Sequence, residues 1–381
     1  MRDKRHFSGR ERLRGGRKMK IVLVSFSKLP TLQNYLFNTY EHMSELGQNV
    51  YTINSDEINV PFTLSEKNMT INVPNSPLPT PSSLKKMMGT VKEIVGRIVE
   101  LNPDVVHFIS KHTWNYPIIR KLKKKTNIKI VHTFHDPIGH KGDLVRYGVI
   151  MYNKLIGRSA HAVVVHSGKS FDETVEKLKP RAKVFTAPLG CTKWRPYKET
   201  EATQKRLLIF GRINNYKGCD MIPAIAEEVA KIDWEIKIVV AGKASKDVKQ
   251  TTLDAISACS NIEFTQGLIP EEEIDDYFYN CDAVLITHTS MTQSGVVLDA
   301  YSHSKPIVSF EIEGIAEFLS ERSLCAPAFD IVEYARKACE LTRDSEHLKK
   351  ISKQAWEFGK NNFASENMAR EFLTIYNNIH S

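Results

Sequence analysis

Two basic residues, Arg212 and Lys217, lie where an apolar run ends and a polar turn begins. The run at 207–210, Leu-Leu-Ile-Phe, is typical of a buried strand, and Gly211 lets the backbone turn sharply after it. Open α/β sheets bind ligands at the carboxyl ends of their strands. An Arg guanidinium can donate two hydrogen bonds to phosphate oxygens, and a Lys ammonium adds a point charge. The pair therefore suits a diphosphate. The alternative is a surface turn with two incidental cations.

A second segment with anion-binding features follows another apolar run, at 283–288. The loop after it is polar and contains Gly295, and we expect a helix from about Ser294 to His303. Such a loop presents unpaired backbone N–H groups and the positive end of the helix dipole to a ligand. Two strand ends with these features predict a single phosphate site.

These motifs resemble the donor domain of the family 4 retaining glycosyltransferases. The resemblance rests on Gly-Arg…Lys-Gly at 211–218 and on the strand, loop and helix that end in Lys-Pro-Ile-Val at 305–308. The intervening order also matches, at 238–242, 261–267 and 281–284. The resemblance implies the α/β fold called GT-B: two Rossmann-like domains with doubly wound parallel sheets face a cleft, and the C-terminal helix crosses back to the first domain.

The resemblance also implies an activity. A sugar would pass from a UDP- or GDP-type nucleotide sugar to a hydroxyl acceptor, a glycan or lipid-linked saccharide of the kind used in polysaccharide biosynthesis, with retention of anomeric configuration. Arg212, Lys217 and the helix at Ser294 would neutralise the departing diphosphate, so no metal ion or other cofactor would be needed. His135, in a Thr-Phe-His segment, would reach the donor sugar.

Further residues are expected to bind the nucleotide sugar, with the base near the loop after the strand at 261–267. They are Gly211, Gly267, Leu268, Ile269, Gln293, Ser294, Gly295 and Asp299.

The chain departs from the family pattern at one position. The family usually carries two glutamates separated by seven residues, and these fall on Met291 and Asp299 here. An aspartate keeps the acceptor oxygens that a ribose needs, whereas Met291 cannot hydrogen-bond a sugar. Asp299 could also be an ordinary exposed helix residue. Because of Met291, a non-catalytic subunit of the same fold is an alternative hypothesis. A nucleotide-sugar epimerase or phosphorylase of the same fold is a further alternative.

Three other patterns in the sequence have both a functional and a structural interpretation. His135 could cap the turn before Asp136 and Pro137 instead of contacting a sugar. A metal site would draw on His132, His135, Asp136 and His140. It is disfavoured because residues three apart on a strand face opposite sides. The segment Ser-Gly-Lys-Ser at 167–170 lacks the first glycine of a P-loop, and Ser167 is expected to cap a helix instead.

Length and charge indicate two domains and a basic N-terminal extension. At 381 residues the chain exceeds what one core usually supports. Residues 1–18 hold eight Lys or Arg and two acids, which is +6 of the net +9, and they are expected to be disordered. The remaining +3 disfavours nucleic-acid binding. The expected domains are an acceptor domain at 19–195, a donor domain at 196–360 and a crossover helix at 361–381.

The N-terminal half alternates buried strands with helices, which favours a parallel sheet covered on both faces. Strands are expected at 20–25, 49–53, 104–109, 128–134, 162–166 and 184–187, and helices at 32–46 and 83–101. A polar segment at 188–205 links this half to the second α/β series, and the last helix is expected at 366–379.

Location is predicted from cysteines, hydropathy and basic residues. The six scattered cysteines indicate reduced thiols in the cytoplasm. No apolar run approaches the roughly 18–20 residues that span a bilayer. Basic residues near Trp114 and Tyr116 suit a peripheral contact with anionic lipid at the inner face of the membrane, or form a solvated helix face. They are Lys85, Lys86, Lys123, Lys124 and Lys125.

Overall fold

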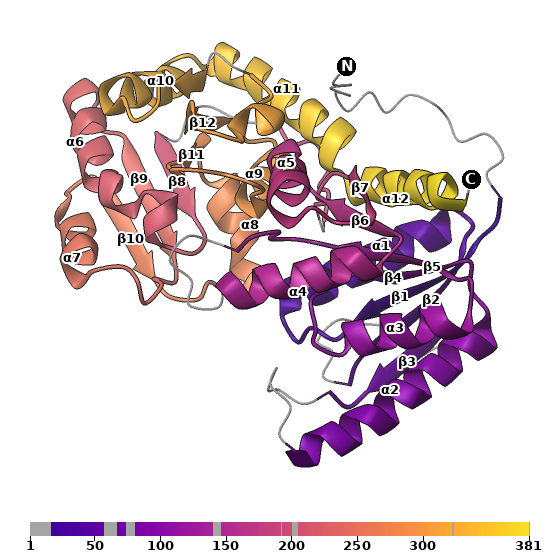
Figure 1. The fold of residues 1–381 in the computed structure, drawn as a ribbon. Coiled ribbons are helices and arrows are strands. Elements are labelled where there is room, and N and C mark those ends of the chain that lie inside the picture. Colours follow the sequence, from indigo (N-terminus) through magenta and orange to yellow (C-terminus); the bar gives the residue numbers. More distant parts are fainter. Residues whose placement is uncertain are drawn as a thin grey trace. The chain divides into compact units, whose positions relative to one another are not determined.

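The chain folds into two compact units in the computed structural model, which describes residues 17–56, 67–73, 81–139, 146–191, 193–199, 205–321 and 324–380 (Figure 1). The side chains of residues 81–86 are outside this description. The first unit comprises Met1–Thr192 and Ser365–Ser381, and the second comprises Lys193–Ala364. Residues 1–16 of the basic extension therefore lie outside the described part of the chain. The same is true of the side chains of Lys85 and Lys86.

The first unit is built on a seven-stranded sheet in the order β3-β2-β1-β4-β5-β6-β7. Every pairing is parallel, which suits strands that are apolar on both faces. The strands are β1 (Lys20–Ser25), β2 (Asn49–Ser55), β3 (Asn68–Ile71), β4 (Val105–Phe108), β5 (Lys129–Thr133), β6 (Ala162–Val165) and β7 (Lys183–Thr186).

Helices cover both faces of this sheet. One core cluster joins residues of the sheet to α1 (Pro30–Glu45) and α12 (Ser365–His380). A second cluster joins the other face to α2 (Pro81–Leu101), α3 (Asn115–Lys125) and α4 (Arg146–Ser159). The C-terminal helix thus packs on the first unit, as expected for a crossover helix. Ser167 caps α5 (Gly168–Glu173) by accepting a hydrogen bond from the Ser170 N–H at 3.1 Å, which confirms the expected cap.

The second unit has a six-stranded parallel sheet in the order β10-β9-β8-β11-β12-β13. Its strands are β8 (Arg206–Phe210), β9 (Lys237–Gly242), β10 (Ile262–Gln266), β11 (Ala283–Ile286), β12 (Ile307–Phe310) and β13 (Cys325–Ala326). The strand order reverses between β8 and β11, which pair directly. In doubly wound sheets a reversal of this kind marks the place where a ligand binds.

Helices flank this sheet too, and α10 packs on α6 while α11 packs on α9. The α-helices are α6 (Ile222–Ile232), α7 (Gln250–Ala258), α8 (Glu271–Tyr279), α9 (Gly295–Ser302), α10 (Ile331–Arg343) and α11 (Ser345–Phe363). Two parallel sheets with helices on them confirm the expected fold class. Within the described residues, no helix has the length and apolar character needed to cross a membrane.

Candidate active site

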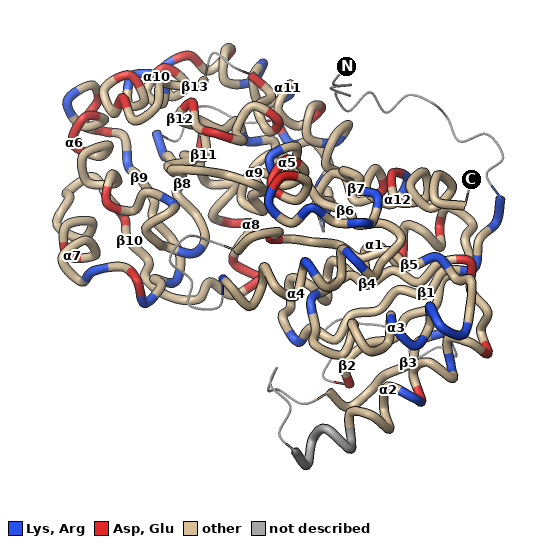
Figure 2. Tube along the Cα trace, viewed as in Figure 1, with Lys and Arg blue, Asp and Glu red and all other residues tan. Residues whose placement is uncertain are grey.

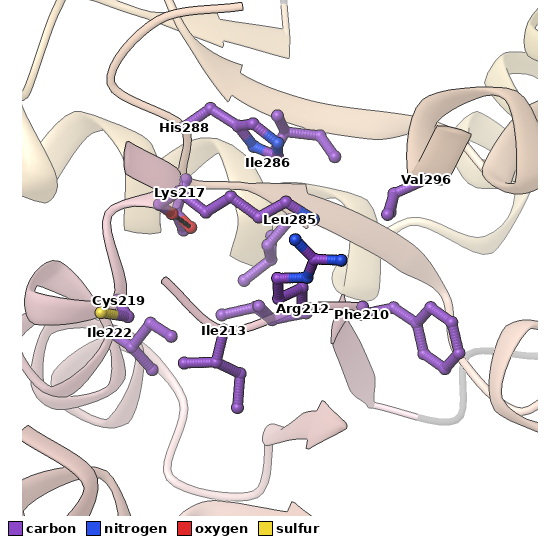
Figure 3. Close-up of a pocket in the computed structure, with 13 residues that line it drawn as sticks. Phe210, Arg212, Ile213, Lys217, Cys219, Ile222, Leu285, Ile286, His288 and Val296 are labelled. Atoms are coloured by element: carbon purple, nitrogen blue, oxygen red, sulfur yellow. Dashed lines mark hydrogen bonds between the residues drawn. The ribbon is translucent and has the colours of Figure 1, made fainter. Parts of the chain in front are cut away.

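A pocket lies at the carboxyl ends of β8 and β11, where the strand order of the second unit reverses (Figure 3). It is lined by Ile209, Phe210, Gly211, Arg212, Ile213, Lys217, Cys219, Ile222, Leu285, Ile286, Thr287, His288 and Val296. The structure therefore brings together the two segments that the sequence singled out, one after each strand. Gly211, Arg212 and Lys217 are the expected site residues that line it.

Close backbone contacts shape the edge of the pocket and require glycine. A Cβ atom on Gly242 would lie 1.8 Å from the carbonyl oxygen of Gly211, so only glycine lets β8 and β9 approach this closely. Gly211 has a φ of +92°, and a Cβ atom there would lie 3.4 Å from Lys217 Nζ and 3.3 Å from Val296. Gly211 therefore keeps open the space beside the Lys217 ammonium.

The turn after β8 is held by its own hydrogen bonds. The Asn214 side chain accepts from the Lys217 N–H at 3.1 Å and caps a short 3-10 turn. The Thr287 hydroxyl donates to the Lys217 carbonyl oxygen at 2.5 Å, which ties the turn to the end of β11. Gly218 has a φ of +68°, and a Cβ atom on it would lie 2.2 Å from the Thr287 carbonyl oxygen. These contacts hold the backbone that carries Lys217 in place.

Two cations face the pocket with no acidic side chain among its lining residues. The Arg212 side chain is exposed and that of Lys217 is half-buried, and the two end close together in Figure 3. Loss of water around Lys217, and then the charge of Arg212, lower the pKa of Lys217 to about 8. An anion in the pocket would relieve this repulsion. The arrangement suits a phosphate group.

His288 is a lining residue that the sequence interpretation missed. It is only 5% exposed, and its Nδ1 has no hydrogen-bond partner among the described residues. Burial, and then the charge of Lys217, lower the pKa of His288 to about 3, so the imidazole is neutral at ordinary pH. The sequence signal was weak, because His288 stands at the end of an apolar run like an ordinary core residue.

The helix α9 begins beside the pocket. Ser294 is its N-cap residue, but the Ser294 side chain makes no capping hydrogen bond. Val296 in the first turn lines the pocket, whereas the expected contacts Gln293, Ser294 and Gly295 adjoin it without lining it. The positive end of the helix dipole therefore adds to the charge of the two cations.

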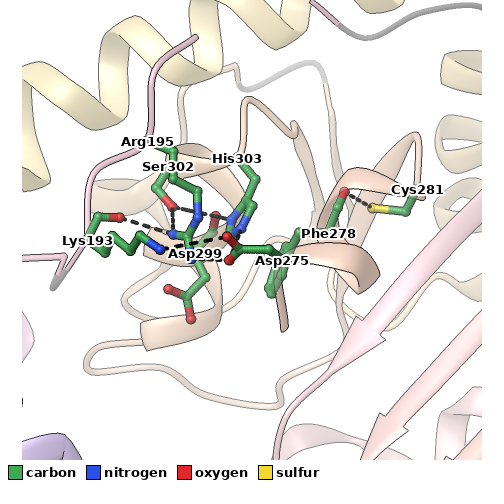
Figure 4. A network of polar contacts seen from close by, with 8 residues as sticks. All are labelled: Lys193, Arg195, Asp275, Phe278, Cys281, Asp299, Ser302 and His303. Carbon is green, nitrogen blue, oxygen red and sulfur yellow. Dashed lines mark hydrogen bonds and ion pairs between the residues drawn. The ribbon is translucent and has the colours of Figure 1, made fainter. Parts of the chain in front are cut away.

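Asp299, one turn further along α9, is half-buried and does not line the pocket. Burial raises the pKa of its carboxyl group to about 6, with the Arg195 charge opposing the shift. Figure 4 shows its carboxylate to one side of a polar network. Asp299 is not the fully exposed helix residue of the alternative interpretation, and its role toward a ribose stays a prediction.

The polar network beside Asp299 was not foreseen. Arg195 pairs with Asp275 of α8, and its guanidinium donates to Ser302 Oγ at 3.1 Å (Figure 4). His303 lies 3.2 Å from Asp275 and donates from Nδ1 to the Asp299 carbonyl oxygen at 2.6 Å. Chiefly because of Arg195, the pKa of Asp275 is lowered to about 2. The network fastens the start of the second unit to α8 and to the end of α9.

The segment expected to hold the base follows β10. The Gly267 N–H donates to the Gly242 carbonyl oxygen at 3.1 Å, and Leu268 is 84% exposed. None of Gly267, Leu268 and Ile269 lines the pocket. They lie at the same carboxyl edge of the sheet, two strands from β8.

His135 belongs to the first unit and follows β5. Its Nε2 donates to the Ile109 carbonyl oxygen at 2.9 Å, and its ring packs on Tyr35 and His166. Burial lowers its pKa, with the hydrogen bond to the Ile109 carbonyl oxygen opposing the shift. Its contact with a donor sugar stays a prediction, as does the alternative of a residue that holds the turn.

Other buried histidines lie in strands of the same sheet or directly after them. His107 contacts Tyr376 and Thr133, His132 donates to the Thr133 carbonyl oxygen at 2.8 Å, and His166 donates to that of Ala187 at 3.0 Å. Burial lowers the pKa of all three, to about 3 for His132 and His166. Among the described residues, no group of three or more His, Cys, Asp or Glu side chains is placed to hold a metal ion.

Met291, where the family pattern has a glutamate, is 3% exposed, and its N–H donates to the Glu313 carbonyl oxygen. Lys123, Lys124 and Lys125 are exposed in the last turn of α3.

Family comparisons agree with the fold. The family model described as "Glycosyl transferases group 1" matches residues 204–344, and that described as "Glycosyltransferase Family 4" matches residues 32–192. Two Rossmann-like units and these matches define a glycosyltransferase of the GT-B fold. The chain belongs to the family 4 type of these glycosyltransferases.

Solved structures with a similar fold include three GT-B proteins. Sucrose-phosphate synthase from Thermosynechococcus elongatus is 16% identical with a TM-score of 0.71, covering 96% of this chain and 99% of that one. A glycosyltransferase from Rickettsia africae is 18% identical with a TM-score of 0.70 and the same coverage. Anabaena HepE in complex with UDP-glucose is 13% identical with a TM-score of 0.68, covering 94% of this chain and 100% of that one. At these identities the likeness concerns the fold alone.

A sequence relative is the phosphatidylinositol N-acetylglucosaminyltransferase GPI3 subunit of Saccharomyces cerevisiae. It is 21% identical over 269 residues, which is 60% of this chain and 59% of the yeast protein.

Proposed function

We propose that this chain transfers a sugar from a UDP-type nucleotide sugar to a hydroxyl acceptor. The observation that carries the proposal is the convergence of Arg212, Lys217 and the start of α9 on one pocket without an acidic lining residue. A diphosphate is the ligand that best matches two adjacent cations and a helix N-terminus. Asp299 would accept hydrogen bonds from the ribose, and Gly267 to Ile269 would contact the base.

The proposed reaction retains the anomeric configuration. The bond from the anomeric carbon to the diphosphate oxygen breaks, and the acceptor oxygen attacks the same face of the sugar. The departing diphosphate takes up the acceptor proton. Arg212 and Lys217 then contribute by stabilising the charge that develops on the leaving oxygen, the kind of contribution that is usually the largest. In this proposal no metal ion is needed, because the two cations and α9 supply the charge.

The comparisons support the choice of donor and acceptor class. UDP and UDP-glucose are the ligands named for the Anabaena HepE structures, which share this fold. The yeast relative is named as a subunit of a phosphatidylinositol N-acetylglucosaminyltransferase, and this supports a glycan or lipid-linked acceptor. We propose a cytoplasmic location, because the six cysteines are scattered along the sequence, as in proteins that keep reduced thiols.

A panel of UDP- and GDP-sugars tests the proposal through release of the nucleoside diphosphate. Arg212→Ala and Lys217→Ala should each lower turnover by about 10²-fold or more, as removal of one preorganised charge does. Lys237→Ala is the matched control, because Lys237 stands at the amino end of β9 and its ammonium donates to the Ser260 carbonyl oxygen. Near-normal turnover in either pocket variant would contradict the proposal.

Met291 favours a second candidate, a non-catalytic subunit that keeps the fold. A buried methionine stands where the family pattern has a glutamate expected to contact the donor sugar. Wild-type protein that binds UDP and transfers no sugar from any donor would support this candidate. An epimerised sugar product formed without an acceptor, or a requirement for phosphate, would instead indicate an epimerase or a phosphorylase.

A further inference from the structure

The helix α4 exposes a row of large apolar side chains. Tyr147, Met151 and Leu155 are 82%, 66% and 41% exposed. They are spaced four residues apart and therefore share one face of the helix. The opposite face is the one that packs on the sheet, through buried residues that include Val149 and Ile156. Single exposed apolar residues are common, but a continuous row on one helix indicates an interaction surface.

The charged side chains of α4 itself are all positive, whereas the short helix Thr174–Leu178, which also packs on α4, carries Glu176 and Lys177. The sequence of α4 contains Arg146, Lys154 and Arg158 and no acidic residue. The neighbouring helix α3 packs beside α4 and carries five Lys or Arg and likewise no acid. Figure 2 shows this basic character along both helices. We call Tyr147, Met151 and Leu155 with the cations of α3 and α4 the α4 surface.

We propose that the α4 surface docks the chain on an anionic lipid bilayer. The three apolar side chains would enter the boundary between headgroups and acyl chains, with Tyr147 at the depth that tyrosine prefers. Lysines and arginines beside the row would contact anionic headgroups. A second copy of the chain is a poorer occupant, because its own α4 surface would bring the same cations together. The inference goes beyond the proposed function, because it concerns the first unit and does not depend on the donor pocket.

Co-sedimentation of the full chain with vesicles tests the proposal. Binding is expected to vesicles of equal parts phosphatidylglycerol and phosphatidylcholine, and to be at least tenfold weaker with phosphatidylcholine alone. The triple variant Tyr147→Ser, Met151→Ser, Leu155→Ser should lose at least tenfold in partition to the anionic vesicles. These substitutions leave the charge unchanged, so any contribution of the basic residues 1–18 is the same in both proteins.

Two further comparisons separate the α4 surface from general adsorption. Trp234→Ser with Val332→Ser removes apolar side chains that are 76% and 61% exposed in the second unit, and this control should bind like wild type. Lys154→Gln with Arg158→Gln should weaken binding by about fivefold per cation and reduce its salt dependence. If the triple variant does not fold, Tyr147→Trp provides a second test. Vesicles that contain bromine-labelled lipid should quench the fluorescence of the tryptophan introduced at position 147.

Four results would overturn the proposal. They are absence of binding to anionic vesicles, wild-type binding by the triple variant, an equal loss in the control variant, and an unquenched tryptophan at position 147. A concentration-dependent dimer that the triple variant abolishes would assign the α4 surface to a second copy. Binding to an acidic protein with no vesicle binding would assign it to a protein partner.

Discussion

The lowered pKa of Lys217 predicts how affinity for a diphosphate depends on pH. In the ligand-free pocket its pKa is about 8, below the ordinary 10.5, because the ammonium is desolvated and lies near Arg212. A diphosphate binds the protonated form better and so raises this pKa. Affinity should therefore be full below pH 8 and fall as the pH rises through 8. At pH 9 about one tenth of Lys217 is charged, so Kd should rise about tenfold, or ~1.4 kcal/mol.

Calorimetric titration of UDP between pH 7 and pH 9.5 measures this slope. The terminal phosphate is ionised throughout, since a phosphate monoester loses its second proton near pH 6. His288 and Cys219 also line the pocket, and neither changes protonation in this pH range, because the pKa of His288 is about 3 and that of Cys219 is about 11. Two buffers with different ionisation enthalpies should reveal proton uptake on binding near pH 8.5.

Lys217→Arg is the matched control, because a guanidinium keeps its charge over the whole range. Its affinity profile should be flat. A flat profile in the wild type, or the same decline in Lys217→Arg, would refute the assignment of Lys217 to the diphosphate.

Three further predictions follow from other residues. Asp299→Asn should weaken UDP binding by about 1–3 kcal/mol in calorimetry at pH 7.5, where the carboxyl group with a pKa of about 6 is ionised; unchanged affinity would remove Asp299 from the site. His135→Ala should lower turnover by roughly 10–10³-fold and leave UDP affinity within about twofold, and an equal loss of both would show a different role. The free energy of unfolding should fall between pH 7.5 and pH 5 by about 2 kcal/mol for each of His132 and His166, because the unfolded state binds protons that these buried rings exclude; chemical denaturation that shows no decrease would contradict this.

Local patterns were sufficient to predict the main elements of the fold. Continuous apolar strands such as β4 and β6 are identifiable because both of their faces are buried. The edge strands β3 and β13 were missed, because one has a single buried residue and the other only two residues in all. Their pairing depends on the neighbouring strand more than on their own composition.

The pocket was predictable only in part. Arg212 and Lys217 have a recognisable position after a strand and a glycine, so their types and spacing point to an anion. His288 and Thr287 could not be recognised, because their importance comes from the pairing of β8 with β11. The contact between Arg195 and Asp275 joins residues eighty positions apart, and no local pattern encodes it.

The central claim is that the pocket at the ends of β8 and β11 binds the diphosphate of a UDP-type donor. A crystal structure of the protein with UDP tests it most directly. The account predicts phosphate oxygens within hydrogen-bond distance of the Arg212 guanidinium and the Lys217 ammonium, beside the first turn of α9. A diphosphate bound elsewhere, with Arg212 and Lys217 turned to solvent, would contradict it.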